Sequence, residues 1–116
     1  MISNPRDFAC VDPFESTWNV KFLWQQVGIA IRHADTIDCK FILSSGAEQV
    51  EKVIAFQHAD LKAFSKSRNR EITDAWVMNL AAEHLRFMIE SGEDMDKTLV
   101  TLGLEDLERS QRALVH

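Results

Sequence analysis

The spacing of apolar residues changes along this chain, and that change limits the fold more than any other feature of the sequence. Ile37, Cys39, Phe41 and Leu43 occupy every second position, as in a β-strand with one buried face. Between residues 76 and 88 the apolar positions instead recur every three or four residues, as on one side of an α-helix. A chain with both periods is predicted to combine a sheet with helices, which is the α+β class.

The alternating segment is predicted to form a β-hairpin. Residues 44–47 contain Gly46 and two serines, which favour a short turn, and residues 51–56 continue as a second strand. A hairpin of two strands is only marginally stable alone, so it must pack against helices or pair with a further strand. We therefore expect a small antiparallel sheet with helices packed on one face.

A helix is predicted to precede the hairpin. Asp12 has the character of an N-cap acid, Pro13 would occupy the first helical position, and Glu15 follows as in a capping box. Apolar residues are then spaced by three and four up to residue 34. Strands remain the alternative, because residues 20–24 and 27–31 also alternate with period two, and Gly28 would cost a helix about 1 kcal/mol. We predict the helix, preceded by an arm at residues 1–11.

Three helices and a short strand are predicted after the hairpin. A helical period runs through residues 60–64 and ends in the polar residues 65–70. Thr73 or Asp74 can cap the next helix, which extends to Ser91 with Gly92 beyond it. Residues 98–102 fit a short strand and residues 104–114 a last helix. The predicted order is helix, strand, strand, helix, helix, short strand, helix, in one domain of residues 12–116.

Composition and charge limit the partners of the chain. Among 116 residues, 13 Lys and Arg stand against 18 Asp and Glu, which leaves a net charge of −5 and disfavours nucleic-acid binding. No apolar run reaches the length of a secretory signal or a membrane span, so we expect a cytoplasmic protein without membrane contact. Cys10 and Cys39 are far apart and form no CxxC pair, as expected of reduced thiols.

Motifs that carry chemistry are not recognisable in this sequence. The four glycines are isolated, so they form neither a phosphate-binding loop nor a nucleophile elbow. The acids of residues 90–96 lack the register of a calcium-binding loop, and His84 has neither the HExxH nor the ExxH spacing. We expect no metal and no cofactor, and the sequence favours a non-catalytic role.

Large rings supply the leading functional hypothesis. Phe14, Trp18, Phe22 and Trp24 fall within eleven residues and would lie on more than one side of the predicted helix. Either a fuller monomer core covers them or a partner does, and interfaces are enriched in such side chains. We expect a protein-interaction or accessory module, with these four residues at a homodimer interface or against a larger protein partner.

Two other hypotheses stay open. A small-molecule-binding protein or enzyme would need a pocket lined by His58, His84 and Trp76, because imidazole can act as base or ligand near neutral pH. A phosphate- or nucleic-acid-contacting module would use a local cluster of cations with no acid among them. The members of that cluster are Lys62, Lys66, Arg68 and Arg70.

Overall fold

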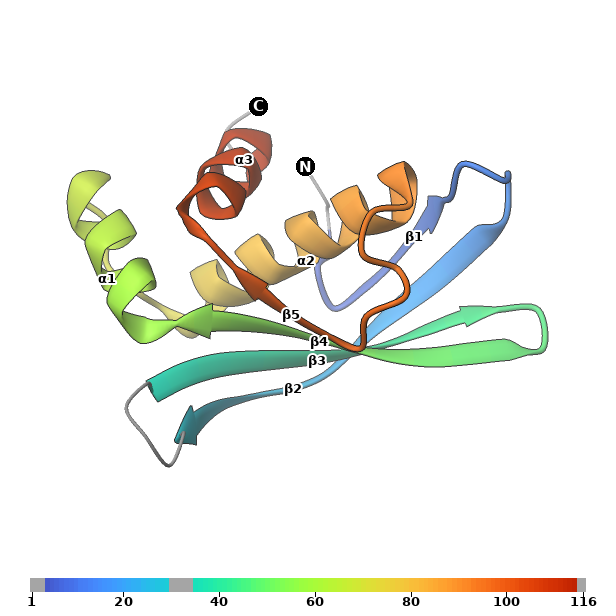
Figure 1. Cartoon of the computed structure of the whole chain (residues 1–116), viewed down its shortest axis with the longest axis horizontal. Coiled ribbons are helices and arrows are strands. Elements are labelled where there is room, and N and C mark those ends of the chain that lie inside the picture. Colours follow the sequence, from blue (N-terminus) through green and yellow to red (C-terminus); the bar gives the residue numbers. More distant parts are fainter. Residues whose placement is uncertain (1–3, 30–34, 115–116) are drawn as a thin grey trace.

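Five strands and three helices make up the described part of the chain, residues 4–29 and 35–114 of a computed structural model (Figure 1). The strands are β1 (Asp7–Val11), β2 (Thr17–Ile29), β3 (Asp35–Ser45), β4 (Glu48–Gln57) and β5 (Leu99–Leu102). Their order in the sheet follows their order in the chain. The first four pair antiparallel, and β5 joins β4 in parallel. The predicted α+β class is confirmed, but the sheet is larger than a hairpin and one of its pairings is parallel.

The predicted N-terminal helix is wrong. Within residues 4–29 there is no helix, and Thr17–Ile29 forms strand β2 between β1 and β3. Residues 7–11 of the predicted arm form strand β1. The last residues of the predicted helix, 30–34, lie outside the described residues.

The turn before β2 explains why a helix start was predicted there. Asp12 does accept backbone hydrogen bonds, as a cap would: its Oδ1 is 2.9 Å from the amide nitrogens of Phe14 and Ser16. Glu15, however, has a left-handed φ of 67°, which no helical residue adopts. The chain therefore reverses from β1 into β2 instead of starting a helix.

A β-bulge explains the helix-like spacing inside β2. The pairing with β3 shifts between Phe22 and Trp24, so Leu23 is an extra residue on this strand. Phe22 packs edge-on against Phe41, with ring centroids 5.5 Å apart, on the face that the helices cover. After the bulge Trp24 pairs with Lys40 and faces the opposite side. Apolar residues three and four apart thus arise without a helix.

The predicted hairpin is confirmed. β3 and β4 pair from Thr36 and Gln57 at one end to Ser45 and Glu48 at the other. Gly46, in the turn between them, has a φ of 60°, a conformation that glycine adopts without steric cost.

The later helices are also confirmed. They are α1 (His58–Ser67), α2 (Asp74–Ser91) and α3 (Leu104–Leu114). Strand β5 begins one residue later than the predicted strand 98–102 and ends at the same residue. Thr73 caps α2 through its Oγ1, which accepts from the amide nitrogen of Trp76 at 3.1 Å. Gly92 ends α2 with a left-handed φ of 79°.

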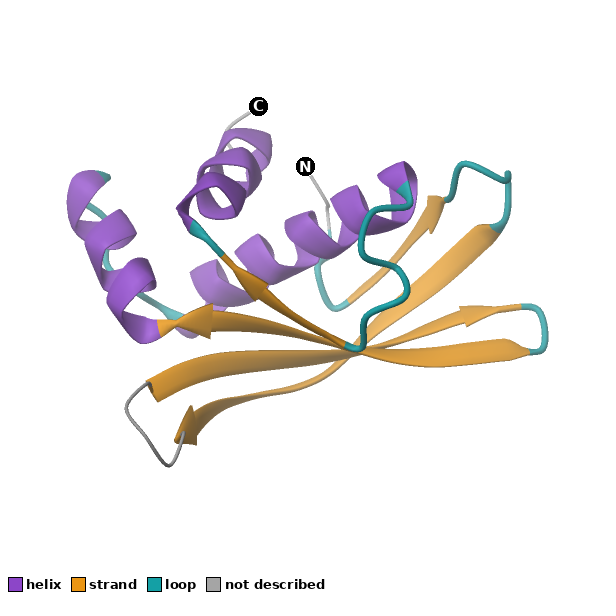
Figure 2. Ribbon diagram, viewed as in Figure 1, coloured by secondary structure: helices purple, strands orange, loops and turns teal. Residues whose placement is uncertain are grey.

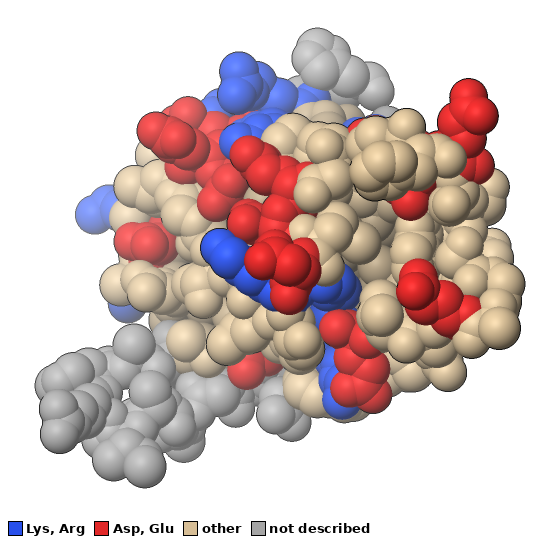
Figure 3. Space-filling view, turned by 45° about the vertical axis from the view of Figure 1, so that its right-hand side comes forward, with Lys and Arg blue, Asp and Glu red and all other residues tan. Residues whose placement is uncertain are grey.

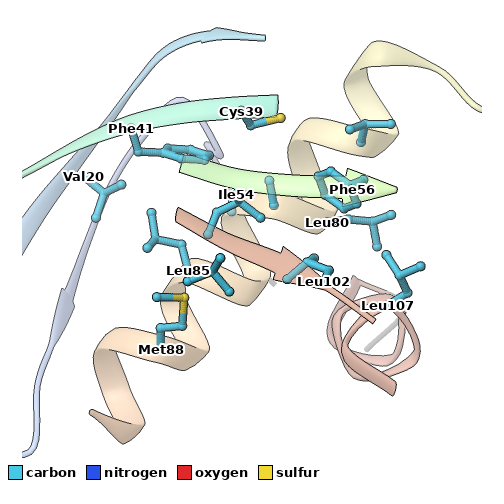
Figure 4. Close-up of a cluster of buried hydrophobic side chains, with 14 of the residues drawn as sticks. Val20, Cys39, Phe41, Ile54, Phe56, Leu80, Leu85, Met88, Leu102 and Leu107 are labelled. Carbon is cyan, nitrogen blue, oxygen red and sulfur yellow. The ribbon is translucent and has the colours of Figure 1, made fainter. Parts of the chain in front are cut away.

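All three helices lie on one face of the sheet (Figure 2). The core forms between that face and the helices (Figure 4). Sheet residues of this core, all nearly inaccessible, include Cys39, Phe41, Leu43, Ile54 and Phe56. The helices contribute Leu80, Leu85, Met88 and Leu107. Alternation in β3 and β4 therefore directs one set of side chains into the core and the other set away from it.

Candidate functional site: the open face of the sheet

The second face of the sheet has no helix over it in the part of the chain that the structure describes (Figures 1 and 2). We call this surface the open face. Strand pairing and alternation assign its members. Its larger apolar members are Val11, Leu23, Trp24, Ile42, Val53 and Leu99. Its charged members are Asp7, Lys21, Asp38, Lys40 and Glu51.

One cross-strand row brings four of these residues together. Trp24 is paired with Lys40, Lys40 with Val53, and Val53 with Leu99, so the row crosses β2 to β5. The Nζ of Lys40 lies 5.7 Å from the centre of the Trp24 ring. Trp24 keeps 37% of its surface exposed and Leu99 keeps 57%. A broad apolar row therefore faces water in the isolated chain.

Charged side chains on the open face are mixed in sign. Lys40 also bonds Glu51, with Nζ 3.0 Å from Oε2, and Asp7 is the pairing partner of Lys21. The charged members assigned to the open face are two lysines and three acids, a net charge of −1 against −5 for the whole chain. Most of the excess negative charge thus lies on other surfaces.

A shallow hollow of about 520 Å³ lies on the same face. Leu23 and Ile42 form its apolar part, and Asp7, Lys21 and Gln49 are among its polar residues. The bulge at Leu23 places this leucine beside Ile42 instead of in the core. The open face is therefore uneven enough to receive side chains from a second surface.

The four predicted interface residues do not form one stripe. Phe14 projects from the turn between β1 and β2 and is 86% exposed. Trp18 is buried on the covered face, where its Nε1 donates to Oδ2 of Asp12 at 3.0 Å, and Phe22 is half-buried on that same face. Of the four, Trp24 alone lies on the open face. A role in binding remains a prediction for each of them.

The three predicted pocket residues lie in different surroundings. His58 is exposed at the start of α1. Trp76 is buried, stacked 6.0 Å from Phe64, and its Nε1 donates to Oε1 of Gln111 at 2.8 Å. His84 is buried two turns further along α2. Among the described residues, no ring contact joins these three to one another, so the geometry does not support a pocket that they share.

His84 is nevertheless unusual. Neither ring nitrogen has a hydrogen-bond partner in the described structure, and burial lowers the pKa of its imidazole. Three neighbouring charges also act on this pKa: Asp106 and Asp94 raise it, and Arg109 lowers it. At neutral pH the residue is a neutral core side chain, and its burial prevents contact with a substrate.

The charged groups of α2 beside His84 are engaged with one another. The guanidinium of Arg86 bonds Glu83 and Glu90, each at 2.8 Å, and Arg109 of α3 stacks 4.1 Å from the centre of the Phe87 ring. The hydrogen bond that Arg86 donates to the Glu83 carboxylate is the largest cause of a raised pKa at Arg86. This cluster joins α2 to α3 and needs no ligand to balance its charge.

The predicted cation cluster is exposed but divided. Arg68 lies 5.3 Å from the centre of the Phe64 ring, and Arg70 lies 5.4 Å from that of Trp76. Both guanidinium groups thus cover aromatic rings of the core. Lys62 and Lys66 are exposed on α1, and phosphate binding by this cluster remains a prediction.

The cysteines are buried thiols. Burial raises the pKa of Cys10 to about 11 and that of Cys39 to about 12, so both are protonated at neutral pH and poor nucleophiles. Residues 4–29 and 35–114 hold no cluster of three or more His, Cys, Asp or Glu side chains placed to bind a metal ion. Within the same residues, no helix combines the length and apolar character of a membrane span.

Comparison with protein families, with curated proteins and with solved structures gives no match to this chain.

Sequence reasoning missed most of the open face. Ile42, Val53 and Leu99 were not predicted as site residues, and Lys40 was assigned only to a strand. A signal was present, because Ile42 is apolar at a position where alternation expects a polar residue. The row itself depends on pairing between segments far apart in sequence, which no local pattern shows.

Proposed function

We propose that this chain is a cytosolic protein-interaction module whose open face pairs with the open face of a second copy. The observation that carries the proposal is the row from Trp24 to Leu99, where large apolar side chains stay exposed on an uncovered sheet face. Large apolar side chains that stay exposed on one face are typical of interfaces. Two sheets can pack face to face about 10 Å apart with their side chains interdigitating.

The open face approaches the size of a standard dimer interface. Strands lie about 4.8 Å apart and rise about 3.3 Å per residue, so four neighbouring strands over about eight residues present roughly 500 Å² in projection. The accessible surface of the side chains is larger than this projection. A standard interface buries about 800 Å² per partner, which is within reach of this face.

Charge favours a second copy as the partner. Two chains of net charge −5 repel each other, but the charged residues assigned to the open face contribute only −1 of that charge. Because this face carries both lysines and acids, a two-fold axis can place Lys21 or Lys40 of one copy against acids of the other. Isologous pairing therefore combines apolar burial with charge complementarity.

Light scattering after size-exclusion chromatography tests the proposal. The wild-type chain is expected to approach twice its monomer mass as its concentration rises. Trp24→Glu and Leu99→Glu are each expected to weaken association at least about tenfold, as substitutions in an interface centre do. Circular dichroism checks that both variants remain folded.

Leu104→Glu is the matched control. Leu104, the first residue of α3, is 48% exposed, close to Leu99 in exposure but on the helix side. It should leave association unchanged. A wild-type chain that stays monomeric at high concentration would contradict self-association and point to a different protein as the partner. Equal dissociation by Leu104→Glu would place the interface elsewhere.

A further inference from the structure

A second apolar hollow lies at the end of the molecule opposite α1, away from the open face. It is formed where the turn between β1 and β2, the end of the β3–β4 hairpin, and the C-terminal end of α2 with its following loop come together (Figure 1). Its volume is about 300 Å³, at the lower end of the range for ligand pockets. Phe14, Trp18, Val50, Ile89 and Met95 supply the apolar lining.

The walls of this hollow are held in place without a ligand. Asp12 fixes the β1–β2 turn, because its carboxylate accepts from the amides of Phe14 and Ser16 and from Nε1 of Trp18. Gly92 brings the end of α2 against the same turn: a Cβ at this glycine would lie 3.5 Å from the Pro13 side chain. A preformed hollow loses little conformational entropy when a side chain enters it.

Phe14 stands at the edge of the hollow with most of its surface in water. At 86% it is more exposed than any other large apolar side chain that the structure describes. The hydrogen bonds to Asp12 hold the turn that presents Phe14, so its exposure is part of the fold. Exposed aromatic side chains beside apolar pockets are frequent centres of binding energy, and the nearby Met95 can adapt to different guests.

The two charged residues that line the hollow are acidic, and the one ammonium bonded to its wall, that of Lys52, is buried and donates to the backbone carbonyl of Met95. Asp12 and Glu48 line it, and no Lys or Arg is among its lining residues in the described structure. The hydrogen bond from Trp18 is the largest cause of a lowered pKa at Asp12, so that carboxylate is ionised at neutral pH. Glu15 and Glu93 are exposed in the adjoining turn and loop. Figure 3, turned toward this end, shows uncharged surface with separate acidic groups on its right-hand side, and Lys and Arg beside acids toward the middle of the view.

We propose that this hollow binds a segment of a partner protein in which a large apolar side chain is flanked by Lys or Arg. The apolar side chain enters between Phe14, Trp18 and Met95, and the flanking cations lie against Asp12 and Glu48. The negative surroundings select basic segments and reject acidic ones. This binding is independent of the open face, because none of the lining residues belongs to that face.

Three matched peptides test the proposal in an NMR titration of the full chain: acetylated and amidated Lys-Trp-Lys, Glu-Trp-Glu and Lys-Ala-Lys. Lys-Trp-Lys is expected to shift the backbone amides of Phe14, Val50 and Met95 at millimolar concentration. Glu-Trp-Glu should bind about fivefold more weakly, because two exposed ion pairs are replaced by repulsion. Lys-Ala-Lys should cause no saturable shift, since it lacks the ring.

Variants locate the site. Phe14→Ser should abolish the shifts and Glu48→Lys should remove the preference for the basic peptide, while both side chains are exposed enough for the fold to be kept. Glu105→Lys, an exposed acid in the first turn of α3, is the control with the same change in charge and should bind as wild type.

Three outcomes would overturn the proposal. Equal binding of the acidic and basic peptides would show that charge does not select the ligand. Lack of any shift with Lys-Trp-Lys would show that the hollow does not bind such a segment. If the peptide instead dissociates a dimer of the chain, a second copy occupies the hollow. If Trp24→Glu loses the dimer but still binds the peptide, the hollow and the open face are independent binding surfaces.

Discussion

The two faces of the sheet use the same strands for different purposes. Along β3, Cys39 and Phe41 are inaccessible beneath the helices, whereas their neighbours Lys40 and Ile42 keep part of their surface in water on the open face. The covered face is almost entirely apolar, and the open face alternates apolar rows with paired charges. The difference indicates that one face maintains the fold; the other is the face for which we propose association.

Substitutions of two adjacent residues in β3 are expected to give the largest difference in the free energy of unfolding between the two faces. Phe41→Ala leaves a cavity in the core and is expected to lower the free energy of unfolding by about 3–5 kcal/mol. Ile42→Ala, one position further on the open face, should lower it by about 1 kcal/mol or less in the monomer, because little buried contact is lost. Urea denaturation at low protein concentration measures both. Equal losses would mean that the open face is part of the monomer core.

Lys52 is the charged exception on the covered face. This buried side chain pairs with Phe41 across the strands, and its ammonium donates to the backbone carbonyls of Met95 and Lys97. Desolvation is the first cause of its lowered pKa. The contacts hold the loop after α2 against β4, so Lys52 stabilises the wall of the apolar hollow.

Lys52→Met should therefore destabilise the chain by about 1–3 kcal/mol, because two carbonyls lose their donor. Lys62→Met on exposed α1 is the control and should change stability by about 0.5 kcal/mol or less. Urea denaturation gives the two values, and amide exchange of residues 95–97 should rise only in the Lys52 variant. If Lys52→Met were neutral, the covered face would not need this charge.

Substitution of His84 is expected to have the smallest effect, a change in how the free energy of unfolding depends on pH. Because burial lowers its pKa in the folded state, the unfolded chain binds the proton more strongly, and protonation favours unfolding. The stabilising effect of the neutral imidazole is complete above the unfolded pKa of about 6.5 and is lost as pH falls through the lowered folded value, by at most about 1.4 kcal/mol per pH unit.

Thermal unfolding between neutral and mildly acidic pH measures this dependence. His84→Leu should flatten the decrease in stability below about pH 6.5, where the unperturbed imidazole titrates. His58→Gln, at an exposed site, should leave it unchanged. A His84 variant with the wild-type pH profile would show that other groups control acid sensitivity.

The elements that were predicted correctly are those whose signals are local. The hairpin has its alternation and turn within about twenty residues, and α2 has Thr73 and Gly92 as cap residues at its two ends. β2 failed because Asp12 uses the side-chain hydrogen bonds of a helix cap to close a β-turn. The bulge at Leu23 then breaks the period that would have revealed a strand.

The candidate site was harder to predict for a related reason. Trp24 was identified from ring content alone, but its neighbours are set by pairing over long sequence distances. Leu99 reaches the row through a parallel pairing with β4 after two intervening helices. Only the assembled sheet places Val53 between Lys40 and Leu99.

Hydroxyl-radical footprinting at low and high protein concentration tests the central claim most directly, because it reports which side chains self-association covers. If the open faces pair, labelling of Trp24 and Leu99 falls as concentration rises, while that of Phe14 stays constant. Protection of Phe14 with Trp24 and Leu99 unchanged would contradict it, since the second copy would then occupy the apolar hollow and not the open face.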